Sequence, residues 1–414
     1  MGGRRVVITG LGVVAPNGIG KDAFWSNLVA GHSAVDYITA FDPSPFPCKV
    51  AAEVKDFKPE QFMQARRTKH RGRFSQFAVA AAKLALEDSG LNLADEPPQR
   101  VMLCLGTSAN GIGDVTEVAR IGFDITGVAG IPLTSGIEYL AHAVAGHVSI
   151  ELGIRGQAMT VASACLAGLD VVQWATAQIV ADKAGVVLAG STDALFAPFS
   201  FGTICASGSL SQFDNPATCA SRPYDLHRDG MVLGEGSAVY VLEELEHAFA
   251  RRATIYAEIL GFAAGNEGGY GHRVDAGELA LTEAIRTALE RASLGQQEID
   301  YINAHGNALP DYDLVETLAF KRAFGSSAYN IPVSSIKSMI GHAMGAATAF
   351  QVAAACLALQ SQTVSPTINL DVPDPECDLD YVPSRARRIR LRNVLINGHS
   401  MGGTHSVLIL GQPR

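Results

Sequence analysis

The chain has 414 residues, of which 48% are hydrophobic and 18% are charged, and its formal net charge is −9. This composition excludes a largely disordered chain, because such chains combine low hydrophobicity with high net charge. The negative charge disfavours general nucleic-acid binding, which requires a basic surface. The length exceeds one ordinary hydrophobic core and predicts two or three domains or layers.

Neither a membrane span nor a secretory leader is predicted. Residues 346–359 form the longest apolar stretch, which contains Thr348 and Gln351 and falls short of the roughly 18 residues that a span requires. No continuous apolar run follows the basic residues at the N-terminus. The seven cysteines are scattered, without a CxxC pair or a Cys/His ligand spacing, so we expect neither zinc nor disulfides. These features predict a cytoplasmic protein with reduced thiols.

Short β-rich runs alternate with alanine-rich helical stretches in the first part of the chain. Strands are predicted over residues 5–9, 101–105, 157–161, 185–189 and 237–242, and helices over 75–89, 136–152 and 166–184. Strand–helix alternation of this kind indicates an α/β protein whose sheets are covered by helices.

The second part of the chain resembles the first. The matched pairs, in order, are 75–91 with 279–294, 101–108 with 299–307, 159–168 with 331–345, and the closing strands 238–243 with 406–410. We therefore predict two similar halves, residues 1–250 and 251–414. The alternative is a shared α/β rhythm without duplication. The linking segment 246–254 is charged and lacks Pro and Gly, so we expect the halves to pack together.

Cys165 is a candidate nucleophile. It follows a predicted strand and opens an Ala/Gly-rich helix, in Ser163-Ala164-Cys165-Leu166-Ala167-Gly168. A helix N-terminus supplies free N–H groups and positive potential, which favour a thiolate, lower its pKa and stabilise an oxyanion. A cysteine among apolar residues is more often a core residue, so the motif alone leaves both interpretations open.

Two histidines stand at predicted strand-to-helix turns. His305 follows a predicted strand over 301–304, and His342 stands between two nearby glycines. Either one alone has a structural interpretation at least as good as a catalytic one. Residues able to form an ion pair lie nearby in the sequence, namely Lys337, Asp313 and Glu316. With Cys165, these residues provide a nucleophile, two imidazoles and a candidate ion pair.

Seven motifs carry a resemblance to a known family. They are VVITGLGVVAPNGIG (6–20), GTSANGIG (106–113), SACLAG (163–168), SRPYDLHRDGMVLGEG (221–236), NAHG (303–306), SSIKSMIGHAMGAA (334–347) and GGTHS (402–406). In these stretches the chain resembles β-ketoacyl-[acyl carrier protein] synthases of the elongating type, related to fatty-acid synthases and to the ketosynthase subunits of type II polyketide systems. The resemblance implies the α/β thiolase fold, with two pseudo-symmetric βαβαβαββ halves in five layers, α-β-α-β-α.

The resemblance also implies roles for individual residues. Cys165 matches the family's nucleophile, His305 and His342 its two imidazoles, and Lys337 and Glu316 its supporting pair. It implies that Cys165 takes an acyl group from a carrier-protein thioester, with backbone N–H groups of Cys165 and Met401 holding the oxyanion. Both imidazoles then stabilise the enolate formed as a malonyl thioester loses carbon dioxide. No metal or redox cofactor is implied, because phosphopantetheine arrives on the carrier protein.

Several positions depart from the family pattern. The threonines that ordinarily contact the pantetheine arm are replaced in Asn307-Ala308-Leu309, where Leu309 has no hydrogen-bonding side chain and Asn307 substitutes in part. Phe-Gly-Phe is replaced by His399-Ser400-Met401. Met401 is flexible, so we expect a differently shaped or looser gate over the acyl pocket. His399 either joins the polar site or is structural. The last motif residue, usually Asn, is His405.

Basic residues form two clusters. The first contains Arg66, Arg67, Lys69, Arg71 and Arg73, and the second contains Arg385, Arg387, Arg388, Arg390 and Arg392. Either cluster is equally well explained as a solvated face. The first lies where the family docks its acidic carrier protein, so Arg66, Arg67 and Lys69 are predicted to steer that partner.

Three functions remain open at this stage. The favoured one is a condensing ketosynthase of a type II polyketide or specialised fatty-acid pathway, with housekeeping fatty-acid elongation as its alternative. The second is a non-condensing subunit that fixes chain length, a class that lacks the cysteine. The third is a thiolase-like enzyme that uses coenzyme A. The family is dimeric, so we expect a homodimer or a heterodimer with a chain-length-factor-like subunit.

Overall fold

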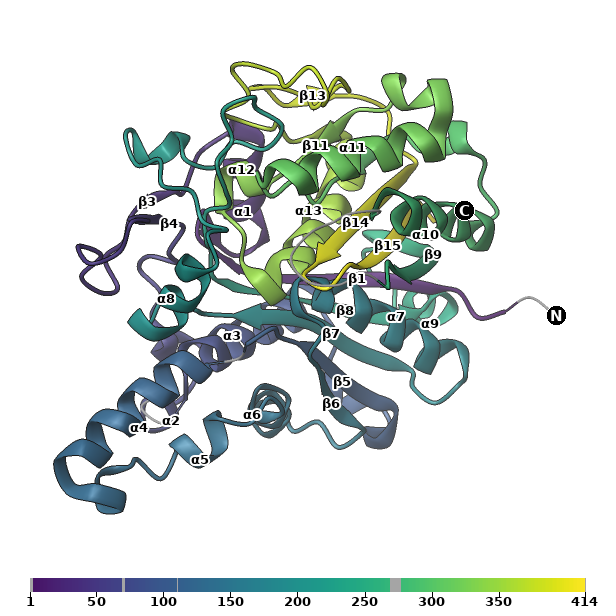
Figure 1. Ribbon diagram of the computed structural model, residues 1–414. Coiled ribbons are helices and arrows are strands. Elements are labelled where there is room, and N and C mark those ends of the chain that lie inside the picture. The colour runs from purple at the N-terminus through teal and green to yellow at the C-terminus, as the bar shows by residue number, and fades with distance from the viewer. Residues whose placement is uncertain (1–2, 69–70, 110, 269–276, 414) are drawn as a thin grey trace.

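The computed structural model describes residues 3–68, 71–109, 111–268 and 277–413 (Figure 1). Its main sheet has 11 strands in the order β11-β10-β14-β15-β9-β1-β8-β7-β5-β6, with β2 paired to β1. Strands from the first half are β1 (Val6–Ala15), β2 (Gly18–Ile19), β5 (Val101–Gly106), β6 (Ala158–Val161), β7 (Val186–Asp193) and β8 (Gly236–Glu244). Strands from the second half are β9 (Ala257–Asn266), β10 (Tyr301–Asn303), β11 (Val333–Ser334), β14 (Asn393–Ser400) and β15 (Thr404–Gly411).

The two halves of this sheet have the same topology. Outward from the centre, β1-β8-β7-β5-β6 mirrors β9-β15-β14-β10-β11. In the first half β5 runs parallel to β6 and β7, and β7 runs antiparallel to β8. In the second half β10 runs parallel to β11 and β14, and β14 runs antiparallel to β15. The halves join where β1 and β9 pair over a short stretch. The predicted internal repeat is confirmed.

Helices separate and cover the two half-sheets. On the outer faces, α3 (Arg73–Ser89) and α6 (Ala143–Leu152) cover the first half, and α10 (Gly277–Ala292) and α11 (Pro310–Phe324) cover the second. Two helices, α7 (Ala167–Val180) and α13 (Ala347–Ser361), pack against each other and against strands of both halves. The arrangement is the five-layer α-β-α-β-α sandwich that was predicted (Figure 1).

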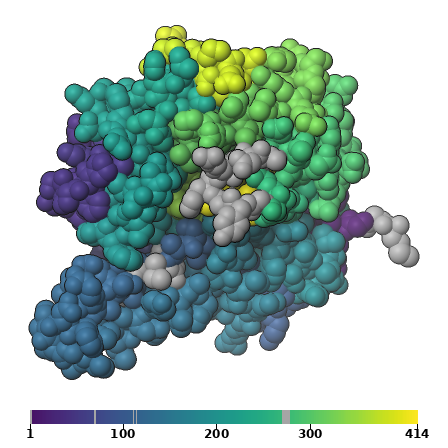
Figure 2. All heavy atoms as spheres, viewed as in Figure 1, coloured from purple at the N-terminus to yellow at the C-terminus, as the bar shows by residue number. Residues whose placement is uncertain are grey.

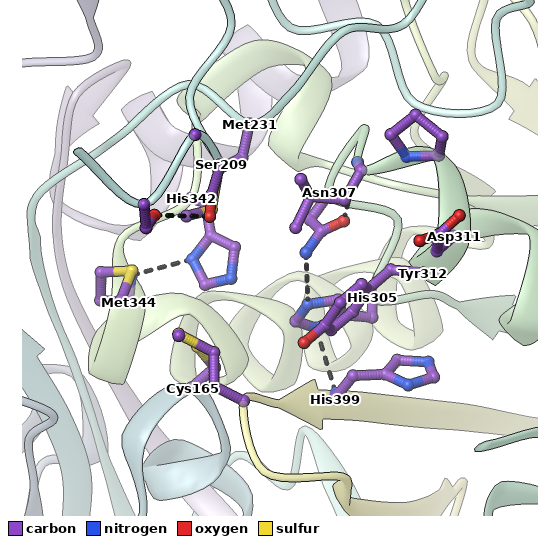
Figure 3. Close-up of a pocket in the computed structure, with 15 residues that line it drawn as sticks. Cys165, Ser209, Met231, His305, Asn307, Asp311, Tyr312, His342, Met344 and His399 are labelled. Carbon is purple, nitrogen blue, oxygen red and sulfur yellow. Dashed lines mark hydrogen bonds between the residues drawn. The ribbon is translucent and has the colours of Figure 1, made fainter. Parts of the chain in front are cut away.

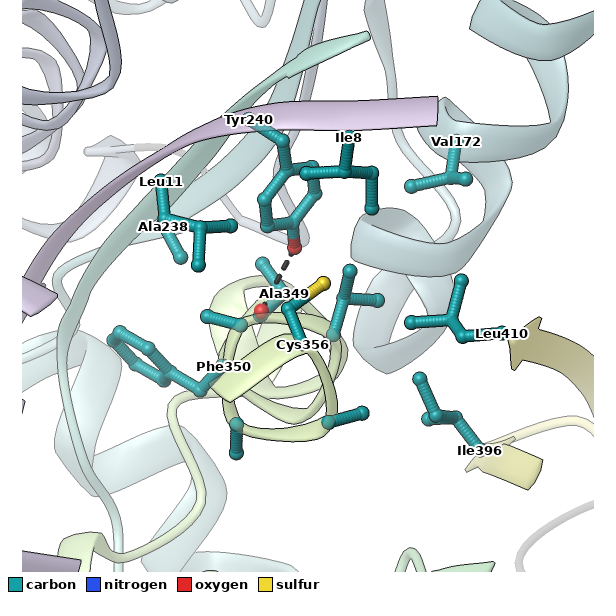
Figure 4. Packing of buried hydrophobic residues seen from close by; sticks show 14 of the residues in the cluster. Ile8, Leu11, Val172, Ala238, Tyr240, Ala349, Phe350, Cys356, Ile396 and Leu410 are labelled. Carbon is teal, nitrogen blue, oxygen red and sulfur yellow. Dashed lines mark hydrogen bonds between the residues drawn. The ribbon is translucent and has the colours of Figure 1, made fainter. Parts of the chain in front are cut away.

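The centre of the core is the apolar helix α13. Figure 4 shows side chains of β1, β8, α7, β14 and β15 around it, and the Tyr240 hydroxyl donates to the carbonyl of Ala349 at 2.7 Å. The window Met344–Ser361 is long and apolar enough to cross a membrane by composition, but 83% of it is buried inside the molecule. Its hydrophobicity is therefore explained by packing between two sheets.

A glycine permits the close approach of α7 and α13. A Cβ atom on Gly168 would lie 2.2 Å from the backbone nitrogen of Ala349. Since no side chain fits at that distance, the two central helices cross in contact at this position. The crossing lies one turn beyond Cys165.

One predicted helix is in fact two. The helical pattern over 136–152 is interrupted after α5 (Ser135–Glu138), and α6 begins only at Ala143. Glu138 is buried and accepts hydrogen bonds from the Gly72 N–H at 3.0 Å and the Ser75 hydroxyl at 3.1 Å, at the start of α3. The prediction of one continuous helix is wrong because the spacing of apolar residues in 136–152 carries no information about the hydrogen bonds between Glu138 and the start of α3.

An arm projects from the first half. It consists of α4 (Ile112–Thr126), the following 3-10 turn (Gly127–Gly130) and α5, and it stands away from the body in Figures 1 and 2. Large apolar side chains are exposed along it: Val118, Ile121, Phe123, Ile125, Val128, Leu133 and Ile137. Leu133 is 94% exposed. A patch of this kind marks an interaction surface.

Shorter elements complete the fold. They are α1 (Lys21–Ala30), α2 (Ala65–Thr68), α8 (Pro198–Ala206), α9 (Leu245–Ala250), α12 (Lys337–Ile340), and the two-stranded pairs β3 (Asp36–Tyr37) with β4 (Val50–Ala51) and β12 (Thr363–Val364) with β13 (Arg387–Arg388).

Candidate active site

Two equivalent strained turns lie at the centre of the molecule. A 3-10 turn (Ala164–Leu166) precedes α7, and another (Met344–Ala346) precedes α13. Ala164 has φ of 50° and Met344 has φ of 48°, which are unusual values for residues other than glycine. Each turn presents its next residue at the start of a buried helix. That residue is Cys165 in the first half and Gly345 in the second, so only one of the two turns carries a nucleophile.

Cys165 is buried, at 6% exposed, and its carbonyl accepts a hydrogen bond from the Thr348 hydroxyl at 2.9 Å. Burial raises the pKa of its thiol to about 12, although the nearby Lys337 ammonium acts in the opposite direction. The backbone N–H of Cys165 lowers this pKa, in the predicted direction, but the net shift is upward. Loss of water around the sulfur outweighs the helix potential, and the resting nucleophile is a thiol.

The two imidazoles share one hydrogen-bonding arrangement. Nδ1 of His305 accepts the backbone N–H of His399 at 3.3 Å, and Nδ1 of His342 accepts the backbone N–H of Met344 at 3.0 Å. Because a backbone amide only donates, each neutral ring carries its proton on Nε2. The ring centroids lie 5.2 Å apart, and Figure 3 shows both rings above Cys165. The fold therefore provides two neutral N–H donors beside one sulfur.

Burial keeps these rings neutral. It lowers the pKa of His342 to about 3, with a further contribution from the Lys337 ammonium. Burial also holds the pKa of His305 well below its ordinary value, reinforced by Lys337 and by the His399 ring. Neither ring gains a proton in the physiological pH range.

Lys337 and Glu316 hold the same backbone segment from two sides. The Lys337 Nζ donates to the carbonyl of His305 at 2.5 Å, and Glu316 accepts the N–H groups of His305 at 2.8 Å and Gly306 at 3.0 Å. The predicted candidate ion pair is wrong in detail, because Lys337 binds a carbonyl and the Gln351 side-chain oxygen. Burial lowers the pKa of Lys337 to about 8, against the opposing charge of Glu316.

Asp313 has a separate structural role. Its carboxylate accepts the backbone N–H groups of Tyr224, Asn307 and Ala308 at 2.9 to 3.2 Å. Arg228 lies 3.5 Å from it. Burial raises the pKa of Asp313 to about 7, against the charge of Arg228. This carboxylate fixes the loop that carries Asn307.

Sequence reasoning missed Gln351 as a site residue. Its amide donates to the carbonyls of Asn303, Ala304 and Asn397 at 3.0 to 3.1 Å, and its oxygen accepts from Lys337 at 3.1 Å. It thereby connects α13 to the end of β10 and to the middle of β14. The signal was present, because Gln351 is one of two polar residues in the longest apolar stretch.

Two further histidines extend the site. His399 contacts His305, with ring centroids 5.2 Å apart, and His405, with centroids 4.8 Å apart. His399 Nε2 lies 3.4 Å from Glu316, and His405 Nε2 lies 2.7 Å from Glu267. Both rings are buried. These two histidines, which depart from the family pattern, therefore form one continuous row of imidazoles with His305.

Cys165, His305, His342 and His399 face one cavity of about 190 Å³. Its walls are formed by Cys165, Ser207, Gly208, Ser209, Met231, His305, Asn307, Leu309, Pro310, Asp311, Tyr312, His342, Met344, His399 and Met401. Met401 is 50% exposed and stands at the rim. The Asn307 oxygen accepts the N–H of Leu309 at 3.0 Å. Its nitrogen lies 3.3 Å from His305 Nε2, and because both atoms carry hydrogen in this tautomer, the pair is a contact and not a hydrogen bond.

The predicted docking residues differ in availability. Arg66 is exposed, whereas Arg67 forms an ion pair with Glu151 at 2.7 Å. Arg71 and Lys83 also contact Glu151. Lys69 lies outside the described residues. Of the described part of the first basic cluster, Arg66 is the residue whose charge is best placed to meet a partner.

Comparisons with known proteins identify the family of this site. The model described as Beta-ketoacyl synthase, N-terminal domain matches residues 3–248, and the model described as Beta-ketoacyl synthase, C-terminal domain matches residues 256–371. The 3-oxoacyl-[acyl-carrier-protein] synthase 2 of Coxiella burnetii is 39% identical over 418 residues, which cover 99% of each chain. The tetracenomycin polyketide synthase ketoacyl synthase alpha subunit of Streptomyces glaucescens is 41% identical over 420 residues, covering 99% of this chain and 98% of the relative.

Solved structures agree. The ishigamide ketosynthase/chain length factor has a TM-score of 0.93 at 32% identity, and a type II polyketide synthase acyl-carrier protein in complex with its ketosynthase bound to the hexaketide has a TM-score of 0.91 at 32% identity. Both comparisons cover 100% of both chains. The chain belongs to the β-ketoacyl synthase family, and it is a condensing acyltransferase with the fold of that family.

Proposed function

We propose that the protein condenses an acyl group carried on Cys165 with malonyl-[acyl carrier protein] to give a β-ketoacyl-[acyl carrier protein]. One observation carries this proposal: a single cavity is lined by a cysteine at the start of a buried helix and by two imidazoles that each present an Nε2–H. A nucleophile and two neutral donors are what acyl transfer followed by enolate formation requires.

Acyl transfer is the first step. The Cys165 sulfur attacks the thioester carbon of an acyl-carrier protein, and the carrier's sulfur leaves with the proton of the Cys165 thiol. The N-terminus of α7 lies under the developing oxyanion, and we assign the donors to the backbone N–H groups of Cys165 and Met401. The backbone N–H of Cys165 and the Ser400 hydroxyl stabilise the thiolate, although burial still raises the pKa of the resting thiol to about 12.

Decarboxylation is the second step. The malonyl thioester oxygen accepts hydrogen bonds from Nε2–H of His305 and His342, and carbon dioxide leaves as negative charge moves onto that oxygen. Donors that are already oriented stabilise this charge without reorganisation. The enolate carbon then attacks the acyl group, a carbon–carbon bond forms, and the carbon–sulfur bond to Cys165 breaks. The released thiolate takes one proton from solvent.

Lys337 and Glu316 are positioning residues in this scheme. They hold the His305 peptide through its carbonyl and its N–H, so the ring stays aimed at the cavity. The scheme requires no metal or redox cofactor, because a thiol and two imidazoles supply every nucleophile and donor. Phosphopantetheine is brought by the carrier protein.

The departures from the family pattern support a specialised pathway. His399, Leu309 and Met401 line the cavity and change its polarity and its rim. A flexible methionine at the rim gives a more adaptable gate than an aromatic ring. We therefore favour a type II polyketide or specialised fatty-acid ketosynthase. Housekeeping elongation is the alternative, and relatives of both kinds are about equally similar to this chain.

The protein's partners follow from its surface. The arm exposes apolar side chains, and β6 is the edge strand of the sheet, so both are suited to a second subunit. We propose a dimer, either of two copies or with a chain-length-factor-like subunit, in the cytoplasm. The carrier protein is the other partner. It docks near Arg66, whose positive charge is exposed on a chain of net charge −9.

A loading experiment tests the proposal. The protein is incubated with a panel of acyl-carrier proteins, and intact-mass analysis detects the acyl adduct, which peptide mapping assigns to a residue. We expect one acyl group on Cys165 and none on the Cys165→Ala variant. Addition of malonyl-[acyl carrier protein] should then release a β-ketoacyl product. An adduct on another residue, or elongation by Cys165→Ala, would contradict the mechanism.

The two other functions are disfavoured by specific residues. A non-condensing chain-length subunit has no use for Cys165 beside two Nε2–H donors. A thiolase-like enzyme would load from acyl-coenzyme A and needs no carrier protein. The same loading assay with acyl-coenzyme A in place of the acyl-carrier protein separates this case, since we expect the carrier-bound substrate to load faster.

A further inference from the structure

Two cysteines outside the catalytic centre bring their sulfur atoms into contact. The Sγ atoms of Cys48 and Cys205 lie 3.4 Å apart, although the residues are 157 positions apart in the chain. Cys205 lies in the last turn of α8 and is half-buried, whereas Cys48 is 3% exposed. Neither thiol takes part in the condensation.

The pair stands behind one wall of the substrate cavity. Both cysteines belong to an apolar cluster in which the rings of Phe41, Phe46 and Phe201 pack at centroid distances of 5.3 to 5.4 Å. Met231 and Met344 belong to the same cluster and also line the cavity. The rest of this wall is formed by residues 207–209, which directly follow α8 and line the cavity as well.

We propose that Cys48 and Cys205 are a modification site, where a hydroperoxide converts the two thiols into an intramolecular disulfide. A disulfide has a sulfur–sulfur distance of about 2.05 Å, so the two atoms must approach by roughly 1.4 Å. Rotation of the two side chains together with a shift of the last turn of α8 would supply this movement, because the end of a helix yields more readily than its middle.

The chemistry divides between an accessible and a buried thiol. The Cys205 sulfur attacks one peroxide oxygen, the oxygen–oxygen bond breaks, and Cys205 becomes a sulfenic acid while water or an alcohol leaves. The Cys48 sulfur then attacks the sulfenic sulfur, loses its proton, and water leaves. Two thiols are oxidised and one peroxide is reduced. Burial, and then the neighbouring Cys205, raise the pKa of Cys48 to about 12. The first step is therefore assigned to the more accessible Cys205, and Cys48 attacks only once the sulfenic sulfur is held beside it.

The bond would act on the cavity through the segment after Cys205. The carbonyl of Ser209 accepts the N–H of Met231 at 2.9 Å, and the Cys48 thiol contacts the carbonyl of Leu210 at 3.6 Å. A disulfide at Cys205 therefore restrains both segments of this wall, the one after α8 and the one that contains Met231. We expect oxidised protein to load acyl groups onto Cys165 several-fold more slowly than reduced protein.

The test measures the bond itself and does not depend on catalysis. Full-length protein is treated with hydrogen peroxide, denatured, alkylated with iodoacetamide and mapped by non-reducing mass spectrometry. We expect a cross-linked peptide that joins Cys48 to Cys205, the loss of two of the seven alkylation sites, and full reversal by dithiothreitol. The Cys165→Ala protein should give the same result, so failure of the condensation mechanism would leave this outcome unchanged.

Two variants control the assignment. Cys205→Ser should abolish the cross-link and leave every remaining cysteine open to alkylation, and Cys205 is exposed enough for this change to be tolerated. Cys219→Ser removes another half-buried thiol outside the pair and should leave the cross-link intact. The proposal is overturned if peroxide leaves all cysteines alkylatable, converts Cys205 only to sulfinic acid, or links a different pair.

Discussion

The orientation of each catalytic ring is set by a backbone amide. The N–H of His399 and the N–H of Met344 each occupy one ring nitrogen, so the protons of His305 and His342 stand on the nitrogens that face substrate. The tautomer is thereby independent of any side chain that mutation could remove. What remains to be set is the protonation state, and burial sets it to neutral for both rings.

A pH profile tests this neutrality. Release of carbon dioxide from malonyl-[acyl carrier protein] by Cys165→Ala isolates the imidazole step from the thiol. An ordinary histidine gains its proton near pH 6.5, whereas the pKa of His342 is lowered to about 3 and that of His305 is also lowered. The neutral donors therefore persist as pH falls, and we expect the rate to stay flat from about pH 7 to about pH 5. A fall centred near pH 6.5 would show that one ring titrates normally.

At the scale of the helix, one crossing supports the nucleophile. Gly168 lets α7 touch α13, and Thr348 of α13 holds the carbonyl of Cys165 at 2.9 Å. The unusual backbone conformation at Ala164 is maintained because the packing of α7 against α13 holds the turn in place. The position of the sulfur thus depends on the packing of elements from both halves of the chain.

Substitution at this crossing should be costly. In Gly168→Ala the new methyl group would lie 2.2 Å from the Ala349 nitrogen, so the helices must separate. Overpacking of this kind costs about 1–3 kcal/mol of unfolding free energy. Urea denaturation measures it. Gly146→Ala in α6 is the matched control, because a Cβ atom there meets no atom within 4 Å, and it should be neutral or slightly stabilising. Equal stability of the two variants would contradict the close crossing.

At the scale of the whole molecule, two surfaces differ in chemical character and suit different kinds of partner. The arm is apolar and the region around α2 is basic, on a molecule whose net charge is negative. Apolar area favours a permanent partner, whereas exposed charge favours a transient one that must leave after each cycle. The proposed dimer contact and the proposed carrier-protein contact therefore use distinct surfaces.

Loss of apolar surface on the arm should weaken the dimer. In Leu133→Asp a charge replaces a side chain that is 94% exposed in the single chain, so burial against a partner becomes unfavourable. Size-exclusion chromatography with light scattering should show a shift from dimer to monomer. Leu279→Asp, at an exposed leucine on α10, is the control and should remain dimeric. A dimeric Leu133→Asp protein would remove the arm from the interface.

Charge reversal at Arg66 tests the carrier surface. Arg66→Glu should raise KM several-fold for an acyl-carrier protein and leave turnover of a small thioester mimic unchanged, because the mimic needs no docking. The difference should shrink at high salt. Arg388→Glu, on β13 in the second basic cluster, should change neither substrate. Equal losses on both substrates after Arg66→Glu would refute docking there. Arg67 is less suitable for this test, since its charge is tied to Glu151.

Much of the fold was predictable because the spacing of apolar residues along the chain indicates where the strands and helices lie. Strand β5 and the first part of β7 are continuous apolar runs, and the order of elements repeats in both halves. The break between α5 and α6 was not predictable, because Glu138 ends the pattern by binding the start of α3. The arm was also missed, since its apolar residues are exposed and belong to no buried face of this chain.

The residues of the site could be identified from the sequence, but their hydrogen-bond partners and protonation states could not. The motifs around Cys165, His305 and His342 identify their chemical types and place each at the end of a strand or the start of a helix. The raised pKa of the thiol, the tautomers of the rings and the binding of Lys337 to a carbonyl come from tertiary contacts. Desolvation and hydrogen-bond direction depend on atoms far apart in the chain, so only the folded structure decides them.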